Sequence, residues 1–127
     1  MRVTVEERPE ALVIGLAGNL DIYTVEKLWR SLEPLLPGMR TVVVDLTAID
    51  LIDSAGLGAL VSLRNRLGHD GHRLGVAFGR SAPIFRIAGL SSAFVGAADL
   101  DAVLRRVGPA QATDVRIAGH DAVELAL

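Results

Sequence analysis

The stretch from Thr41 to Leu67 places the strongest constraint on what this chain can fold into. It opens on a β-branched run, Thr41 to Val44, that has no polar alternation and is typical of a parallel strand covered on both faces. Leucines recur at helical spacing in its second half. We therefore expect a central buried strand, a loop over Leu46 to Ile52, and a helix whose N-cap is Ser54.

Two glycines, Gly56 and Gly58, stand in the first turn and a half of that helix, where each costs roughly 1 kcal/mol relative to alanine. Tight packing of the helix against the sheet would explain them, and an ordinary cap would explain Ser54. Alternatively, the bare backbone lets another protein or a phosphate group approach Ser54, and the helix N-terminus favours an added anion. The spacing alone leaves both interpretations open.

The rest of the chain predicts an α/β fold with a mixed sheet that begins with an antiparallel hairpin. Val3 to Glu7 and Ala11 to Ala17 are strand candidates separated by a proline turn, and Gly18 is expected to end the second. Apolar residues at helical spacing predict a helix over Val25 to Leu32. Strand, helix and strand in succession favour a right-handed crossover. We expect four to five strands packed with about four helices.

Three shorter elements are predicted further along the chain. A buried strand is expected over Arg73 to Phe78, and a short helix should begin at Pro83. Asp99 is placed to cap a last helix. The side chains expected to point inward from the short helix are Ile84, Ile87 and Ala88.

Two aspartates, Asp21 and Asp53, flank predicted helix starts. Asp21 can accept amide hydrogen bonds ahead of a helix. Because loops at the carboxyl ends of neighbouring parallel strands converge, Asp21 can also lie beside Ser54 on one rim. Asp53 either orients the serine and presents charge, or is an exposed carboxylate with no special purpose. Both interpretations stay open for each aspartate.

Several of these segments together resemble STAS domains of the anti-sigma factor antagonist type. The resemblance covers about residues 3–107, and the pieces occur in the family's order. It rests on Val42 to Leu46, Ile52 to Gly58, Gly18 to Asp21, Thr24 and Leu28, and later on Gly71, Leu74, Pro83, Gly89, Leu90 and Phe94. The resemblance implies a STAS-like fold in which Ser54 is phosphorylated by a partner kinase.

The resemblance also implies a function. The unphosphorylated chain would bind an anti-sigma factor that is also a serine kinase and so free a sigma factor, and phosphorylation of Ser54 would switch that binding off. A serine phosphatase would reverse the modification. The residues expected to contact the kinase are Asp21, Asp53, Ser54, Ala55, Gly56, Leu57 and Gly58. The chain itself would be no enzyme, would need no cofactor, and would act in the cytoplasm.

A different function on the same fold stays open. STAS domains also occur in transporter tails, stress-signalling assemblies and lipid-trafficking complexes, and fold alone does not settle function. The chain would then be a scaffold or a module that binds a small molecule or lipid. An apolar pocket with a few converging polar groups would favour this alternative. A homodimer also stays open.

Composition narrows the classes further. The 127 residues predict one domain over residues 1–107 and an extension over 108–127, in which Asp114 to Ala118 predict a further strand of open role. Thirteen basic against fifteen acidic residues, with a net charge of −2, argue against direct nucleic-acid binding. No apolar run is long enough to span a membrane, and there is no cysteine for a disulfide or thiolate site.

Catalytic and metal motifs are incomplete. The segment around Ser54 lacks the first glycine of a hydrolase nucleophile elbow, and the glycines after it are too few for a dinucleotide fingerprint. The two histidines of His69 to His72 are too few ligands to predict a metal site. A phosphate-binding loop with a lysine is absent from the sequence. We therefore expect the ATP and the catalytic base to belong to the partner.

Overall fold

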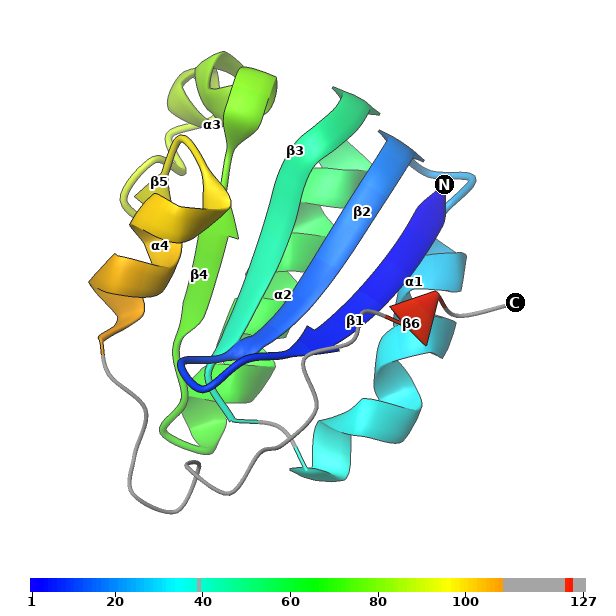
Figure 1. Ribbon diagram of the computed structural model, residues 1–127. Coiled ribbons are helices and arrows are strands. Elements are labelled where there is room, and N and C mark those ends of the chain that lie inside the picture. Colours follow the sequence, from blue (N-terminus) through cyan, green and yellow to red (C-terminus); the bar gives the residue numbers. More distant parts are fainter. Residues whose placement is uncertain (39, 109–122, 125–127) are drawn as a thin grey trace.

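The computed structural model describes residues 1–38, 40–108 and 123–124. These form a sheet with the strand order β5-β4-β3-β2-β1-β6 (Figure 1). β1 (Arg2–Glu7) and β2 (Leu12–Leu20) are an antiparallel hairpin, and β3 (Val42–Ile52), β4 (Leu74–Ala77) and β5 (Val95–Ala97) run parallel to β2. The predicted hairpin and the central position of β3 are confirmed.

Four α-helices pack around this sheet. α1 (Val25–Leu32), which continues as the 3₁₀ turn η1 (Glu33–Gly38), and α2 (Ser54–His69) lie on one face. α4 (Leu100–Val107) covers β3, β4 and β5 on the other face. The 3₁₀ turn η2 (Gly79–Ser81) and α3 (Ala82–Ile87) follow β4 at the end of the sheet where the parallel strands finish. The predicted α/β fold is confirmed.

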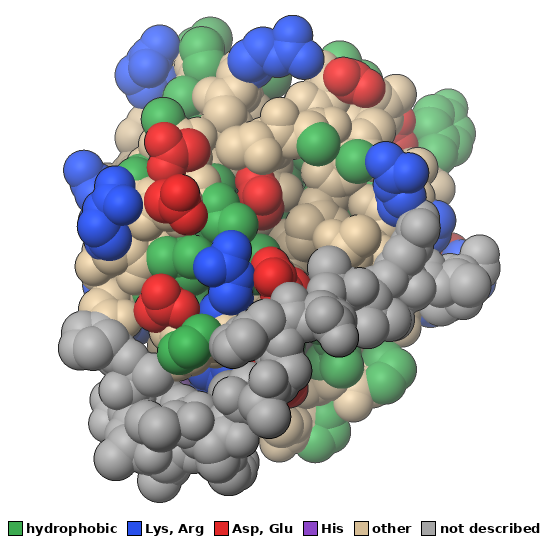
Figure 2. Space-filling model, in the orientation of Figure 1, with side chains coloured by type: hydrophobic (Ala, Val, Ile, Leu, Met, Phe, Trp, Pro, Cys, Tyr) green, Lys and Arg blue, Asp and Glu red, His purple; other side chains and the backbone are tan. Residues whose placement is uncertain are grey.

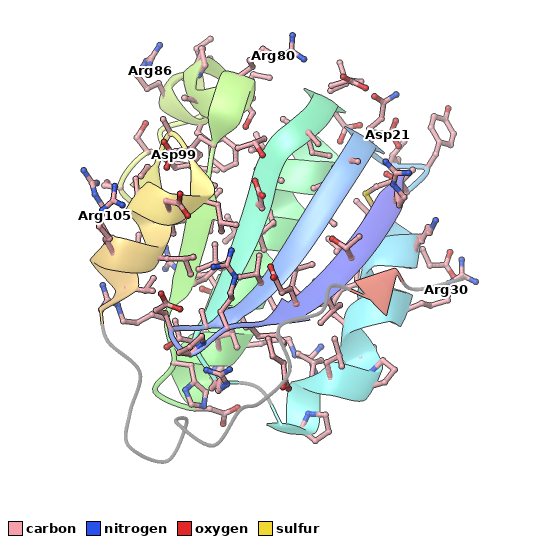
Figure 3. The ribbon with its side chains drawn as sticks, in the orientation of Figure 1. Asp21, Arg30, Arg80, Arg86, Asp99 and Arg105 are labelled. Atoms are coloured by element: carbon pink, nitrogen blue, oxygen red, sulfur yellow. The ribbon has the colours of Figure 1, made fainter. Side chains whose placement is uncertain are left out.

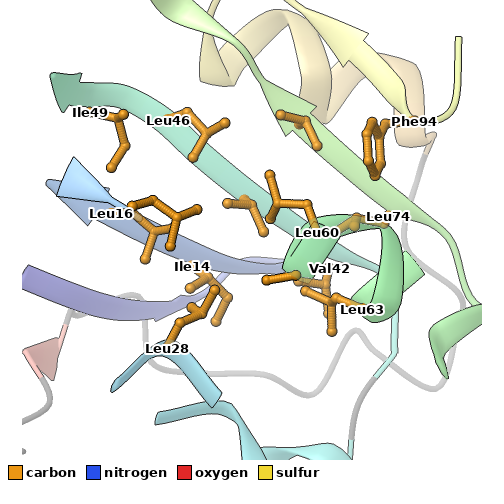
Figure 4. Close-up of a cluster of buried hydrophobic side chains, with 14 of the residues drawn as sticks. Ile14, Leu16, Leu28, Val42, Leu46, Ile49, Leu60, Leu63, Leu74 and Phe94 are labelled. Atoms are coloured by element: carbon orange, nitrogen blue, oxygen red, sulfur yellow. The ribbon is translucent and has the colours of Figure 1, made fainter. Parts of the chain in front are cut away.

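The buried run in β3 faces two hydrophobic cores. Val42 and Val44 pack with the leucines of α1 and α2, whereas Val43 packs with Val103 and Val107 of α4. Figure 4 shows the larger core, which lies between the sheet and α2. Alternate side chains of a strand point to opposite faces, so a strand covered on both sides needs apolar residues at every position. This is the physical reason for the uninterrupted run.

Two predicted strand ends are wrong. β2 does not stop at Gly18 but continues to Leu20, and β3 does not give way to a loop at Leu46 but continues to Ile52. The parallel ladder between them continues through two register shifts and ends on the pair Leu20 and Ile52. Gly18 fits within the strand with a φ of 101°, because glycine tolerates that backbone conformation. Both strands therefore end later in the sequence than the local residue pattern predicts.

The orientation predicted for α3 is also wrong. Phe85 is the buried side chain of this helix, and its ring packs against Phe78 and Phe94 with centroid distances of 4.7 and 5.9 Å. Ile84, Ile87 and Ala88, which were predicted to point inward, are exposed instead. In this helix of six residues, the packing of Phe85 against the two other rings determines which face is buried.

The C-terminal extension reaches the hairpin edge of the sheet. β6 (Val123–Glu124) pairs antiparallel with β1, where Thr4 is opposite Glu124 and Val5 is opposite Val123. The sheet thus has one short strand more than expected. The strand predicted over Asp114 to Ala118 lies outside the described residues. No helix in the described ranges is both long and apolar enough to cross a membrane.

Candidate functional site

The candidate site forms where β2 and β3 end together. Leu20 and Ile52 are the last register partners of the two strands, so the residues that follow them, Asp21 and Asp53, leave the sheet at the same edge. The Asp53 amide also donates a hydrogen bond to the carbonyl oxygen of Leu20 at 3.2 Å. Figure 3 shows Asp21 beyond the end of β2. The fold thus brings the two predicted aspartates to one rim.

Asp53, not Ser54, is the N-cap of α2. Its Oδ1 accepts a hydrogen bond from the Gly56 amide at 3.0 Å, and its extended backbone is the conformation that a capping residue adopts. Ser54 is the first residue of the helix. The serine prediction was wrong by one position because both side chains are good caps and the backbone conformation decides between them.

The second oxygen of Asp53 links two segments that are far apart in the sequence. Oδ2 accepts a hydrogen bond from the Ile22 amide at 3.2 Å. One carboxylate therefore holds the turn between β2 and α1 against the start of α2. The half-buried Asp53 has a structural role, which neither interpretation from the sequence included.

Asp21 forms the turn that precedes α1. Its Oδ1 accepts a hydrogen bond from the Tyr23 amide at 3.0 Å, while the hydroxyl of Thr24 accepts one from the Asp21 amide at 2.9 Å. Such an Asx turn satisfies backbone donors that the sheet and the helix leave unpaired. The amide-accepting interpretation of Asp21 is therefore confirmed, although its partner lies in the turn and not in the helix.

Ser54 is exposed at the start of α2. A helix N-terminus carries amides without intrahelical partners and a partial positive charge, so a phosphate added at its first residue is electrostatically favoured. Because Ser54 is exposed, another protein can approach its side chain.

The two glycines of α2 have different causes. Gly56 is buried, and a Cβ there would lie 2.6 Å from the carbonyl oxygen of Leu20 and 2.9 Å from the Ile52 side chain. Tight packing of helix on sheet therefore explains Gly56. Gly58 is exposed, and a Cβ there would meet no described atom within 4 Å outside its own helix turn. Gly58 leaves a bare patch of backbone one turn beyond Ser54.

An apolar groove of about 360 Å³ begins beside Ser54. It runs between the first turn of α2 and α3, and its lining residues are Ile52, Asp53, Ser54, Leu57, Ile84, Ile87 and Ala88. Sequence reasoning missed the α3 wall because it assigned these isoleucines to the core. The sequence did contain an indication of this wall. Phe85 is a larger apolar residue between Ile84 and Ile87, and a helix this short cannot bury all three side chains.

The two described histidines lie at the C-terminal end of α2, because the His72 amide donates a hydrogen bond to the carbonyl oxygen of Leu67 at 2.9 Å. His69 is the last residue of α2, and a helix rises about 1.5 Å per residue, so it lies roughly 22 Å from Ser54. No group of three or more His, Cys, Asp or Glu residues within the described ranges could hold a metal ion. His120 lies outside those ranges.

Comparison with known sequences gives one family. The family model described as "Mlab, STAS domain" matches residues 3–105. No curated protein matches this sequence significantly.

Solved structures share the fold. An anti-sigma factor antagonist from Mycobacterium paratuberculosis is 26% identical, with a TM-score of 0.74 over 83% of this chain and 92% of that chain. The anti-sigma factor antagonist SpoIIAA in its unphosphorylated form is 20% identical, with a TM-score of 0.66 over 84% of this chain and 98% of that chain. Phosphorylated SpoIIAA from Bacillus gives 21% identity and a TM-score of 0.60 over 81% and 97%.

Proposed function

Because the chain belongs to the STAS domain family, we propose that it is an anti-sigma factor antagonist controlled by phosphorylation of Ser54. Unmodified, it binds an anti-sigma factor that is also a serine kinase, and the sigma factor is released. The kinase supplies ATP and the catalytic base, so this chain is a binding module and not an enzyme. A serine phosphatase restores the active form, and the exchange takes place in the cytoplasm.

The observation that carries the proposal is the exposure of Ser54 at the first position of α2. A kinase must place the γ-phosphate in line with that oxygen, which requires open space around it. Ser54 is exposed, and Gly58 one turn further along α2 adds no side chain beside it. The proposed partner surface consists of Asp21, Asp53, Ser54, Ala55, Leu57 and Gly58 and begins where β2 and β3 end. Gly56, which the sequence analysis also assigned to this surface, is buried against β2 and β3 and is not part of it. The anti-sigma factor antagonists with the same fold support this assignment.

The switch is electrostatic. A phosphate adds about −1.5 to −2 charges, and here it would stand next to the carboxylate of Asp53. Both oxygens of Asp53 already accept backbone amides, so this charge cannot turn away from the phosphate. A partner that buries this rim would have to desolvate both anions. A differential affinity of a few kcal/mol is enough to change a mostly bound population into a mostly free one.

Phosphate transfer tests the site. The purified protein is mixed with a candidate anti-sigma kinase and labelled ATP, and incorporation is compared among wild type, Ser54→Ala and Ser62→Ala. Ser62 is an exposed serine on the same helix and serves as the matched control. We expect labelling to be lost only with Ser54→Ala. Undiminished labelling of that variant would refute the assignment of the site.

The groove beside Ser54 supports a second candidate function. Its lining is largely apolar with one hydroxyl and one carboxylate, which is the composition expected of a site for a small apolar molecule or a lipid chain. A STAS module that binds such a ligand as part of a larger assembly would use this groove. Direct titration with a fatty acid distinguishes this function from the first.

A further inference from the structure

Exposed apolar side chains gather at one end of the molecule. The described residues include five large hydrophobic side chains that are exposed: Ile22, Tyr23, Leu51, Ile84 and Ile87. Ile22 and Tyr23 follow β2, Leu51 is near the end of β3, and the two isoleucines belong to α3, which follows β4. Figure 1 shows that these elements end on the same side, and Figure 2 shows hydrophobic side chains there among arginines. Clusters of this kind mark interaction surfaces.

The groove beside Ser54 is the part of this surface with a defined shape. One wall is the start of α2 with Leu57, and the other is α3 with Ile84 and Ile87. The anchoring of Phe85 between two other rings holds α3 in place. A groove with a fixed wall binds at a lower entropic cost than one that must first be ordered.

The exposure of its walls decides what the groove can hold. Ile87 is 88% exposed and Ile84 is 36% exposed. Sites for small molecules enclose 70–90% or more of the ligand surface, and a groove bordered by a side chain as exposed as Ile87 is more open than that. A protein that covers Ile87 while inserting a side chain would bury both surfaces at once. The groove therefore suits a protein partner better than a free small molecule.

The charged side chains at the groove indicate which charge the partner should carry. Among its lining residues, Asp53 alone has an acidic or basic side chain, and it lies at the Ser54 end. Arg80, in the η2 turn next to α3 (Figure 3), is 3.8 Å from the carboxylate of Asp50. Electrostatic complementarity thus favours a partner with a basic residue near Asp53.

We infer that this groove, flanked by Ser54, receives a large apolar side chain of the anti-sigma kinase, with a basic residue of that kinase next to Asp53. The inference rests on the proposed function and names the contact through which it operates. It also adds a reason for the switch. A phosphate on Ser54 keeps its hydration shell, so an apolar side chain can no longer be buried beside it without stripping water from a dianion.

The test separates binding from phosphorylation. Affinity for the kinase bound to ADP is measured by calorimetry for wild type, Ile87→Ser and Arg86→Ser, and the Michaelis constant for Ser54 phosphorylation is measured in parallel. Arg86 is an exposed neighbour on α3 that does not line the groove, so its variant is the matched control. Urea unfolding of each variant verifies that the fold is unchanged.

We expect Ile87→Ser to weaken binding roughly tenfold or more and to raise the Michaelis constant similarly, with Arg86→Ser close to wild type. Wild-type affinity for Ile87→Ser, alongside normal labelling of Ser54, would overturn the groove inference and leave the proposed function standing. Failure of the kinase to label wild type would instead refute the proposed function. The last experiment is a titration of the protein with dodecanoate. If dodecanoate binds saturably and Ile87→Ser abolishes this binding, the groove is a site for a small ligand and the inference is overturned.

Discussion

At the scale of single residues, Gly56 and Gly58 show how one motif combines two requirements. They are two positions apart on α2, so they face different sides of the helix. Gly56 faces the sheet, where the Leu20 carbonyl leaves no room for a Cβ. Gly58 faces solvent with no described atom near it. The structure therefore gives a packing reason for Gly56 and none for Gly58, which our proposal assigns to the partner surface.

Alanine at each position tests this division. Gly56→Ala should lower the free energy of unfolding by roughly 1–3 kcal/mol or more, since the added methyl forces the helix away from β2. Gly58→Ala should raise it by up to about 1 kcal/mol because alanine is the better helix former. Urea denaturation measures both. Equal effects of the two substitutions would contradict the division.

At the scale of elements, Asp53 is the joint between the β2–α1 turn and α2. Its two oxygens bind amides from different segments, Gly56 in the helix and Ile22 in the turn. The position of the exposed Ile22 and Tyr23 therefore depends on a residue more than thirty positions further along the chain. Asp99 caps α4 in the same way through the Ala102 amide at 2.8 Å.

Asparagine at position 53 separates the two bonds. Asp53→Asn keeps one oxygen for the Gly56 amide but replaces the other by an NH₂ group, which cannot accept from Ile22. We expect faster hydrogen exchange of the Ile22 amide and a stability loss of about 0.5–2 kcal/mol. NMR-detected exchange makes the measurement, with Asp99→Asn as the capping control. Asp99→Asn should leave the exchange of the Ile22 amide unchanged. If Asp53→Asn also left it unchanged, Asp53 would not hold the turn.

At the scale of the whole molecule, the STAS match covers residues 3–105 and leaves the extension outside it. The sheet's described contact with the extension is β6, which pairs with two residues of β1. The described residues of both hydrophobic cores all precede Gly108. We therefore propose that residues 1–107 form the folding domain and that the extension covers the edge of the hairpin.

A chain that ends at Gly108 should fold on its own. We expect a single cooperative urea transition with circular dichroism like that of the full chain, because the truncated chain keeps every described residue of both cores. Loss of β6 exposes more of the β1 edge, and exposed edges pair with other strands, so self-association should increase. Light scattering at several concentrations measures it. A truncated chain without a cooperative transition would show that the extension belongs to the domain.

Much of this protein was predictable because the relevant physics is local. The β-branched run of β3, the apolar spacing of α2 and the Asp99 cap each depend on neighbours in the sequence, and each is confirmed. Family membership was equally readable, since its motifs are spaced along most of the chain. The sequence by itself determined the fold class, the hairpin and the neighbourhood of Ser54.

Tertiary structure alone decided how that neighbourhood is built. Which residue caps α2 depends on the backbone conformation imposed where β3 leaves the sheet, and Asp53 has it. Which face of α3 is buried depends on Phe78 and Phe94, which contribute rings from separate segments. Contacts between distant residues set both outcomes, and no periodicity within a short segment encodes them. The groove that flanks Ser54 is a product of those contacts.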